Sequence, residues 1–250
     1  MLEAKRIAVV IPAFREARLI GRTLTTLPSF VDAVYVVDDA SPDATASAAR
    51  AVADARLRVL RHDVNQGVGA AIVTGYRAAA REHADVIAVM AGDAQMDPAD
   101  LERVVAPVVA GRADYVKGNR FLSPQRRDMP WPRRLAGKVL GAATRIASGL
   151  DVDDCQCGYT AISRHAAEAL PLEALWPRFG YPNDLLLLLA QHGLRVSEVE
   201  VRPIYRDEDS GVRPWHALLI LGLIARRALS GRALPYLARG TSAPGARYSS

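Results

Sequence analysis

Cysteine is scarce in this sequence of 250 residues, and no apolar run is long. The two cysteines, Cys155 and Cys157, stand one residue apart, which is a poor spacing for a mutual disulfide and supplies too few ligands for a zinc site. No segment reaches the roughly 18 apolar residues that predict a membrane-spanning helix. Charged residues near Met1 also argue against a signal peptide. We therefore expect a protein of a reduced, cytoplasmic compartment.

Acidic residues are absent from the C-terminal part of the chain. Residues 210–250 hold six arginines and no Asp or Glu. Without these six charges, the net +5 of the chain becomes about −1 for residues 1–209. A nearly neutral domain with a basic C-terminal end argues against a protein that coats nucleic acid, so we expect no nucleic-acid partner.

Apolar runs and helical patterns alternate through the first half of the chain. This order predicts an α/β fold, with a parallel sheet buried on both faces, and ligands at the carboxyl ends of its strands. The expected strands are 6–14, 31–41, 57–62 and 86–90, and the expected helices are 16–27, 43–55, 67–83 and 99–110. Polar residues follow each strand, at 12–16, 38–43, 65–69 and 93–97. These four polar ends are predicted to meet on one rim of the sheet.

The second half of the chain is less regular. A strand is expected over 114–121, a Pro- and Arg-rich loop over 122–134, helices over 135–148 and 181–193, and a strand over 195–206. There is no internal repeat and no linker that splits the chain, so a single domain is expected over residues 1–213.

Seven fragments occur in an order and spacing typical of one family: "IPAFRE", "VVDDASPDAT", "NQGVGAA", "GDAQMDP", "KGNRF", "CGYTAIS" and "YRDEDSG". Together they resemble the inverting nucleotide-sugar glycosyltransferases of family 2. The similarity is greatest to the branch of dolichol-phosphate mannose synthase and polyprenyl-phosphate sugar transferases. The resemblance covers residues 5–213. It implies the GT-A fold, a Rossmann-like, mostly parallel sheet with helices on both faces.

Asp93 and Gln95 are the candidate metal ligands, at the end of the strand over 86–90. A divalent cation neutralises the diphosphate of a nucleotide sugar, and Mg²⁺ or Mn²⁺ takes oxygen ligands and keeps waters. In the family the motif is usually Asp-x-Asp-x-Gln, and here Ala91 stands in place of its first Asp. The resemblance therefore implies a metal site with one carboxylate ligand fewer than is usual in the family. The alternative is a strand-end turn with Asp97 capping the next helix.

Residues after the first two strands are candidates for nucleoside binding. The resemblance assigns the segment of Pro12, Phe14 and Glu16 to the base and ribose pocket, and the acidic pair Asp38 and Asp39 to the nucleoside. The alternative for the first segment is a strand-to-helix turn, with Glu16 favourable at a helix N-terminus. The alternative for the acidic pair is turn chemistry.

Arg120 and Arg206 are the candidate phosphate-binding residues. Guanidinium groups suit phosphates, and the resemblance implies such groups near the donor and acceptor phosphates. The alternative is surface arginine. Asp184 is a further candidate, since a carboxylate can take the proton of a hydroxyl acceptor. A lipid phosphate is already largely anionic at neutral pH, because its second pKa is about 6, so Asp184 has a structural role as its alternative.

The C-terminal stretch is expected to form an interfacial helix over residues 214–240, followed by a disordered tail over 241–250. Twelve uncharged residues from Pro214 to Ala225 precede Arg226 and Arg227. This is too short to cross a bilayer but suits a helix lying on an anionic membrane surface. The alternative is a core helix or the interface of a homo-oligomer.

The sequence thus predicts a metal-dependent, inverting glycosyltransferase with Mg²⁺ or Mn²⁺ as cofactor. It would move a sugar from a GDP- or UDP-linked donor to a polyprenyl or dolichyl phosphate, on the cytoplasmic face of a membrane. The alternatives are transfer to a glycan or small-molecule acceptor, and a non-catalytic nucleotide-sugar-binding protein, which the substitution at Ala91 favours. A nucleotidyltransferase is disfavoured because "IPAFRE" has no Gly/Lys-rich signature.

Overall fold

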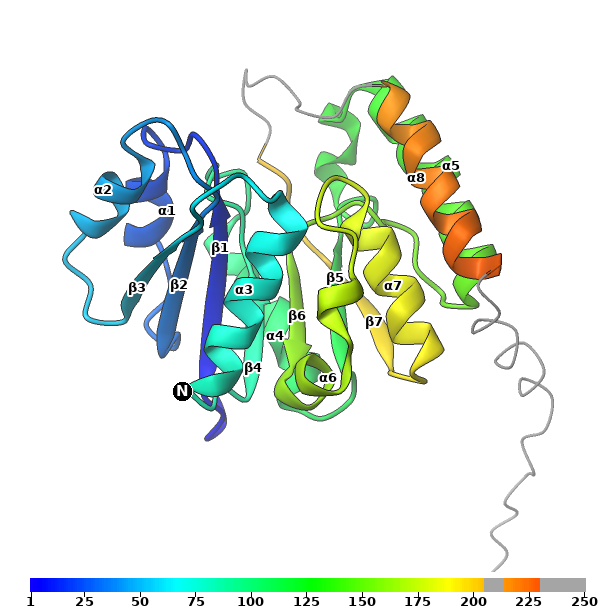
Figure 1. The fold of residues 1–250 in the computed structure, drawn as a ribbon. Coiled ribbons are helices and arrows are strands. Elements are labelled where there is room, and N and C mark those ends of the chain that lie inside the picture. Colours follow the sequence, from blue (N-terminus) through cyan, green and yellow to red (C-terminus); the bar gives the residue numbers. More distant parts are fainter. Residues whose placement is uncertain (205–213, 230–250) are drawn as a thin grey trace, which may run out of the picture.

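The computed structural model describes residues 1–204 and 214–229, with the side chains of Pro214 and Trp215 excepted. Its elements follow the alternating order that the first half of the sequence predicts (Figure 1). They are β1 (Ile7–Ala13), α1 (Ile20–Thr25), β2 (Ala33–Asp38), α2 (Thr45–Arg50), β3 (Leu57–Arg61), α3 (Val68–Arg81), β4 (Val86–Val89), η1 (Pro98–Asp100), α4 (Leu101–Val109), β5 (Tyr115–Asn119), η2 (Pro124–Asp128), α5 (Trp131–Ser148), β6 (Thr160–Ser163), α6 (Arg164–Ala169), η3 (Leu172–Ala174), α7 (Tyr181–Gln191), β7 (Val196–Glu200) and α8 (Pro214–Leu229).

The strands form one sheet in the order β3-β2-β1-β4-β6-β5-β7. β1 pairs in parallel with β2 and β4, and β2 pairs in parallel with β3. β6 is antiparallel to both of its neighbours, and β5 is parallel to β7. The predicted fold class, a mostly parallel sheet with helices on both faces, is therefore confirmed.

The sheet divides the core into two apolar clusters, because successive side chains of a strand point to opposite faces. Val10 and Tyr35 belong to the cluster under α3, α6 and α7, whereas Val9 and Val34 belong to the cluster under α1, α2 and α4. Strands buried on both faces are apolar at every position. This is why β1 and β2 read as unbroken apolar runs in the sequence.

α5 and α8 lie side by side outside α7 (Figure 1). Ile220 and Ile224 of α8 are buried in the same apolar cluster as the leucines of α7. One face of the C-terminal helix is therefore a core face. Residues 230–240, which the sequence predicts as part of this helix, and the tail over 241–250 lie outside the described residues.

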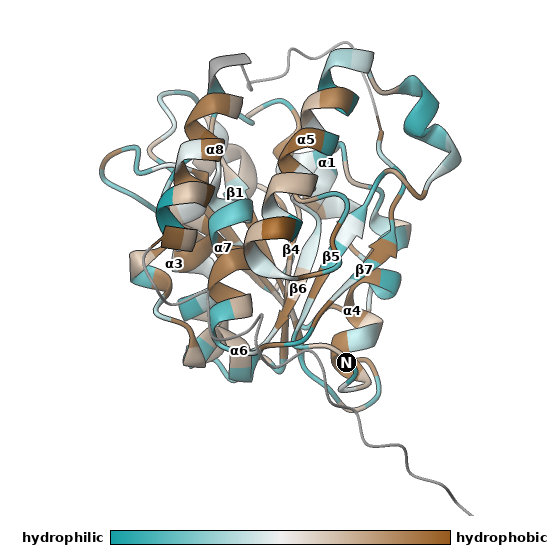
Figure 2. Ribbon diagram, turned by 90° about the vertical axis from the view of Figure 1, so that its right-hand side faces the viewer, coloured by the Kyte–Doolittle hydropathy of each residue, from teal (hydrophilic) through white to brown (hydrophobic). Residues whose placement is uncertain are grey.

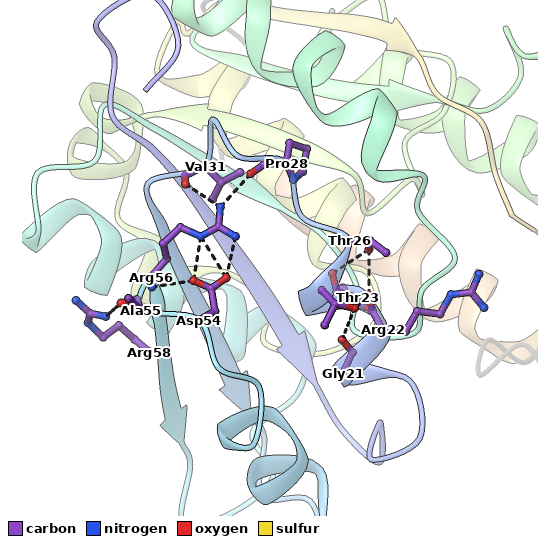
Figure 3. Close-up of polar contacts among 11 residues, drawn as sticks. Gly21, Arg22, Thr23, Thr26, Pro28, Val31, Asp54, Ala55, Arg56 and Arg58 are labelled. Atoms are coloured by element: carbon purple, nitrogen blue, oxygen red, sulfur yellow. Dashed lines mark hydrogen bonds and ion pairs between the residues drawn. The ribbon is translucent and has the colours of Figure 1, made fainter.

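Polar contacts fasten the amino end of the sheet, opposite the predicted rim. The Arg56 guanidinium donates to the carbonyls of Pro28 and Val31, at 3.0 Å each, and to both oxygens of Asp54 (Figure 3). These bonds join the start of β3 to the loop before β2. They hold this end of the sheet without occupying the carboxyl ends of the strands.

Candidate functional site

The carboxyl ends of β2, β1 and β4 are neighbours, because these strands are adjacent in the sheet. The chain reverses sharply after each of them. Arg15, Ala40 and Ala94 have φ angles of 61°, 57° and 54°, in the left-handed region that non-glycine residues seldom adopt. The three predicted polar ends that follow β1, β2 and β4 therefore share one rim.

The loop after β4 carries Asp93 and Gln95 on the wall of a cavity of about 150 Å³. The Gln95 N–H donates to the Asp93 carboxylate at 3.0 Å, and the Ile204 N–H donates to the Gln95 carbonyl at 3.0 Å. The Met96 sulfur lies 3.3 Å from the Ala91 nitrogen. Contacts within the loop and a hydrogen bond from the segment after β7 thus hold the loop in place.

Asp93 and Gln95 offer a carboxylate and an amide oxygen, which are the donor types that Mg²⁺ and Mn²⁺ prefer. Within residues 1–204 and 214–229, no three His, Cys, Asp or Glu side chains gather in a way that could hold an ion alone. The donor set therefore fits a cation that takes its remaining ligands from a diphosphate and water. Asp97 caps the next helix, accepting a bond of 2.9 Å from the Ala99 N–H.

Arg120 lines the same cavity as Asp93 and Gln95. Its guanidinium makes two parallel bonds to the carboxylate of Asp154, at 2.7 and 2.8 Å. Burial raises the pKa of Asp154, but the charge and hydrogen bonds of Arg120 outweigh it, so that this pKa lies below its usual range. The carboxylate is therefore ionised at neutral pH and fixes the direction of the guanidinium.

Asp38 and Asp39 are both buried at the end of β2. The Asp39 carboxylate lies 2.8 Å from Nδ1 of His62 and accepts bonds from the N–H groups of Gln66 and Gly67, at 2.8 and 2.7 Å. Asp38 accepts a bond from the Ser41 N–H at 3.1 Å. Both carboxylates thus organise the loops of the rim.

The end of β1 and the segment after it lie beside this acidic pair. Pro12 is opposite Val37 in the sheet register, and Phe14 is an exposed aromatic side chain with the Arg15 guanidinium 5.3 Å from its ring centre. Glu16 lies beside the loop that carries Asp93, since a Cβ added at Gly92 would be 3.3 Å from the Cγ of Glu16. The two predicted groups of nucleoside residues and the Asp93 loop are therefore adjacent.

The glycine loop over 65–70 serves helix packing. The N–H groups of Gly69 and Ala70 donate to the Pro177 carbonyl, at 2.8 and 3.2 Å. A Cβ at Gly69 would lie 2.6 Å from the Trp176 carbonyl, which no side chain tolerates. Glycine is needed here for this close approach, and both N–H groups are engaged by the Pro177 carbonyl.

Asp184 lies in α7, and it does not line the cavity that holds Asp93. It accepts two bonds of 2.6 Å from Arg227 of α8 and one of 2.8 Å from the Trp176 N–H. In the structure this carboxylate therefore connects α7 to α8. Arg206, the second candidate for phosphate binding, lies outside the described residues.

The cavity is also lined by Arg133, Gln156 and Arg202. Arg202 makes two bonds to the buried carboxylate of Asp100, at 3.0 and 2.9 Å. Arg133 lies in the first turn of α5, within the Pro- and Arg-rich segment over 122–134, where the sequence cannot rank one arginine above another. No sequence motif identified Arg202 as a site residue, because its partner Asp100 is about a hundred residues away in the chain.

Comparison with known proteins agrees with this architecture. The family model described as "Glycosyl transferase family 2" matches residues 8–170. An undecaprenyl-phosphate mannosyltransferase of Micrococcus luteus is 31% identical, over 81% of this chain and 85% of that protein. A UDP-N-acetylglucosamine–dolichyl-phosphate N-acetylglucosaminyltransferase of Methanococcus voltae is 26% identical, over 81% of this chain and 87% of that protein.

A solved structure has the same fold. It is glucosyl-3-phosphoglycerate synthase from Mycobacterium tuberculosis, in complex with Mn²⁺, UDP and glucosyl-3-phosphoglycerate. Its TM-score is 0.66 with 22% identity, over 90% of this chain and 80% of that one. The mostly parallel sheet with helices on both faces is thus that of a GT-A fold, and the chain belongs to glycosyl transferase family 2.

Proposed function

We propose that this glycosyltransferase moves a sugar from a nucleotide-diphosphate sugar to a polyprenyl or dolichyl phosphate, with inversion and with the help of Mg²⁺ or Mn²⁺. One observation carries the proposal: Asp93, Gln95 and Arg120 line one cavity at the carboxyl ends of the sheet. Oxygen donors for a cation and a guanidinium for a phosphate stand together there. The activities named for the Micrococcus and Methanococcus relatives support the lipid acceptor.

In this proposal Asp93 and Gln95 hold the cation. When bound, the cation neutralises charge that develops on the departing diphosphate. Arg120 and Arg206 bind phosphate oxygens. The residues that bind the nucleoside are Pro12, Phe14, Glu16, Asp38 and Asp39. Because the first two strands end beside the Asp93 loop, the nucleoside and the diphosphate can occupy neighbouring parts of one rim.

A phosphate acceptor needs no strong base. Its second pKa is about 6, so it is largely a dianion at neutral pH. The buried ion pair between Asp184 and Arg227 suits this chemistry, because that carboxylate is engaged in holding α8. We propose a structural role for Asp184. A hydroxyl acceptor on a glycan or small molecule would instead need a carboxylate within reach of the sugar.

We also propose that the outer faces of α5 and α8 rest on the cytoplasmic surface of an anionic membrane. Figure 2 views the molecule from the side of these helices. Trp131, Leu135, Val139 and Ile146 are spaced along one face of α5 and are at least half exposed. α5 carries four basic residues and no acid. An apolar stripe flanked by positive charge is the pattern of an interfacial helix. No helix within the described residues is long and apolar enough to span a bilayer.

Turnover tests the proposed reaction. Purified protein, Mn²⁺ and polyprenyl phosphate are incubated with UDP-N-acetylglucosamine, UDP-glucose or GDP-mannose. Formation of a glycosylated lipid supports the proposal. Transfer only to a glycan or small molecule would overturn the acceptor assignment. Mn²⁺-dependent nucleotide binding without transfer or donor hydrolysis would indicate a non-catalytic nucleotide-sugar-binding protein, as the substitution at Ala91 permits.

Vesicle binding tests the proposed membrane surface. The double variant Leu135→Ser/Ile146→Ser should bind vesicles of phosphatidylcholine and phosphatidylglycerol at least about tenfold more weakly, because each buried aliphatic side chain contributes about 1.5–3 kcal/mol. Val64→Ser is the matched control, since Val64 is also an exposed aliphatic side chain but lies on the loop between β3 and α3. Equal binding by all three proteins would refute this surface. If the wild type forms a dimer that the double variant cannot form, the stripe is a homo-oligomer interface instead.

A further inference from the structure

A buried polar network lies directly behind the cavity arginine. Asp154 comes from the loop between α5 and β6, and its side chain is fully buried. It accepts three bonds from Arg120: from the backbone N–H at 3.0 Å, from Nε at 2.7 Å and from Nη2 at 2.8 Å. Because all three donors belong to one residue, this carboxylate fixes both the guanidinium plane and the backbone that carries it.

Glu198 of β7 supports the same arginine from a second side. One of its oxygens accepts a bond from the Asp154 N–H at 2.9 Å, and the other accepts one from the Asn119 side-chain amide at 2.7 Å. Asn119 in turn accepts a bond from the Phe121 N–H at 2.8 Å. Glu198 therefore ties the partner of Arg120 to the residues on both sides of Arg120 in the chain.

Stability alone does not explain this arrangement, because burying charged groups costs free energy. Asp154 and Lys117 are fully buried, and Lys117 donates to the Cys157 carbonyl at 2.6 Å. Apolar side chains of similar volume often stabilise a core as well as buried ion pairs do. The bonds of Asp154 instead give the Arg120 guanidinium a defined geometry in the cavity. Phosphate recognition by arginine depends on such geometry.

We propose that Asp154 and Glu198 are positioning residues, which hold the Arg120 guanidinium in the orientation that phosphate binding requires. This inference rests on the proposed function, in which Arg120 binds a phosphate group in the cavity. Neither carboxylate touches the substrate. Their effect on transfer passes through Arg120, whereas a merely structural network would affect transfer whether or not Arg120 is present.

A double-mutant cycle separates these roles. Wild type, Asp154→Asn, Arg120→Ala and the double variant are compared for kcat and KM, for nucleotide affinity with Mn²⁺, and for thermal unfolding. Asp153→Asn is the matched control, because Asp153 is the preceding residue and has an exposed arginine partner, Arg145, at 2.8 Å. Asp154→Asn keeps the shape of the side chain but turns an amide N–H₂ toward the arginine donors.

Asp154→Asn should lower kcat by about 100-fold, because small displacements of a positioned group cost that much, and Asp153→Asn should not. In the Arg120→Ala background the same change should cost less than about twofold, the additivity error of such cycles. An equal loss in both backgrounds would overturn the inference, as would full activity of folded Asp154→Asn. If Asp154→Asn does not fold, Glu198→Gln takes its place in the cycle, because it keeps the direct bonds between Asp154 and Arg120.

The two hypotheses fail separately. Absence of transfer by the wild type to polyprenyl phosphate counts against the proposed function only. The same four proteins are then compared for Mn²⁺-dependent hydrolysis of the nucleotide sugar, whose diphosphate lies in the same cavity. A loss with Asp154→Asn that disappears in the Arg120→Ala background supports positioning, and a loss that persists there refutes it.

Discussion

Replacing Arg227 by alanine should destabilise the fold, because it removes the partner of a buried carboxylate. The side chain of Asp184 is 1% exposed and that of Arg227 is 17% exposed, with 2.6 Å between Arg227 Nε and Asp184 Oδ1. Loss of one member of a buried pair costs about 3–5 kcal/mol. Since Arg227 is reached by some water, we expect the lower end, about 3 kcal/mol in the free energy of unfolding.

For a protein of this size, 1 kcal/mol shifts the unfolding midpoint by about 2–4 °C. The expected fall in Tm for Arg227→Ala is therefore about 6–12 °C, measured by circular dichroism. Arg226→Ala is the control, because Arg226 is the adjacent exposed arginine on the same helix. A surface change of this kind should alter stability by about 0.5 kcal/mol at most.

A second substitution identifies the cause of the loss. If an uncompensated buried charge is responsible, Asp184→Asn in the Arg227→Ala background should recover part of the stability, because it removes that charge. Equal Tm values for Arg226→Ala and Arg227→Ala would refute the reasoning. The ion pair would then contribute nothing to the attachment of α8 to α7.

Three other outcomes are expected. Asp93→Ala should abolish Mn²⁺-dependent nucleotide binding in calorimetry, and Ala91→Asp should strengthen it; unchanged affinity in the first variant would remove Asp93 from the metal site. Ala40→Gly should stabilise the protein by about 0.5 kcal/mol, because the left-handed backbone costs alanine about 1–2 kcal/mol and glycine loses about half of that gain to chain entropy; a lower Tm would contradict this. Burial lowers the pKa of Lys117, so above that pKa the unfolded chain binds more protons than the native state and stability rises with pH up to about 10.4. In urea unfolding from pH 7 to pH 10, the free energy of unfolding of the wild type should rise relative to that of Lys117→Met. A constant difference would show that the pKa of Lys117 is not lowered.

The strands of the first half were predicted well from the sequence, for a physical reason. β1, β2 and β4 are covered on both faces, so they appear as unbroken apolar runs, and polar residues begin where the cover ends. The resemblance to family 2 glycosyltransferases, and the GT-A fold that it implied, are likewise confirmed.

Helix limits were predicted less well. The segment over 122–134 was expected to be a loop, but α5 already begins at Trp131. Pro132 suggested a loop, yet proline is well tolerated in the first turn of a helix, where its missing N–H has no partner to lose. The helix expected over 16–27 is shorter, Ile20–Thr25. The left-handed turn at Arg15 and the loop after it occupy the earlier residues.

The site was only partly predictable. Asp93, Gln95 and Arg120 were chosen from motifs, and the structure brings all three to one cavity. Asp154 was not chosen, and it lies just before the fragment "CGYTAIS", which begins at Cys157. Its pairing with Arg120 spans 34 residues and depends on how β6 inserts between β4 and β5. Single-sequence patterns describe neighbours along the chain, and this contact is set by strand order.

The C-terminal helix shows why one pattern left two alternatives open. An apolar helix of this length suits a core as well as a membrane surface, and α8 has an apolar face for each. Ile220, Leu223 and Ile224 are buried, whereas Leu218 and Leu219 are exposed. Deleting residues 214–250 would therefore remove core contacts together with the proposed membrane face, and lost lipid binding could not be assigned to either. Substitutions confined to exposed side chains, such as Leu135 and Ile146 of α5, keep the core intact. They are the changes that separate a role in folding from a role at the membrane.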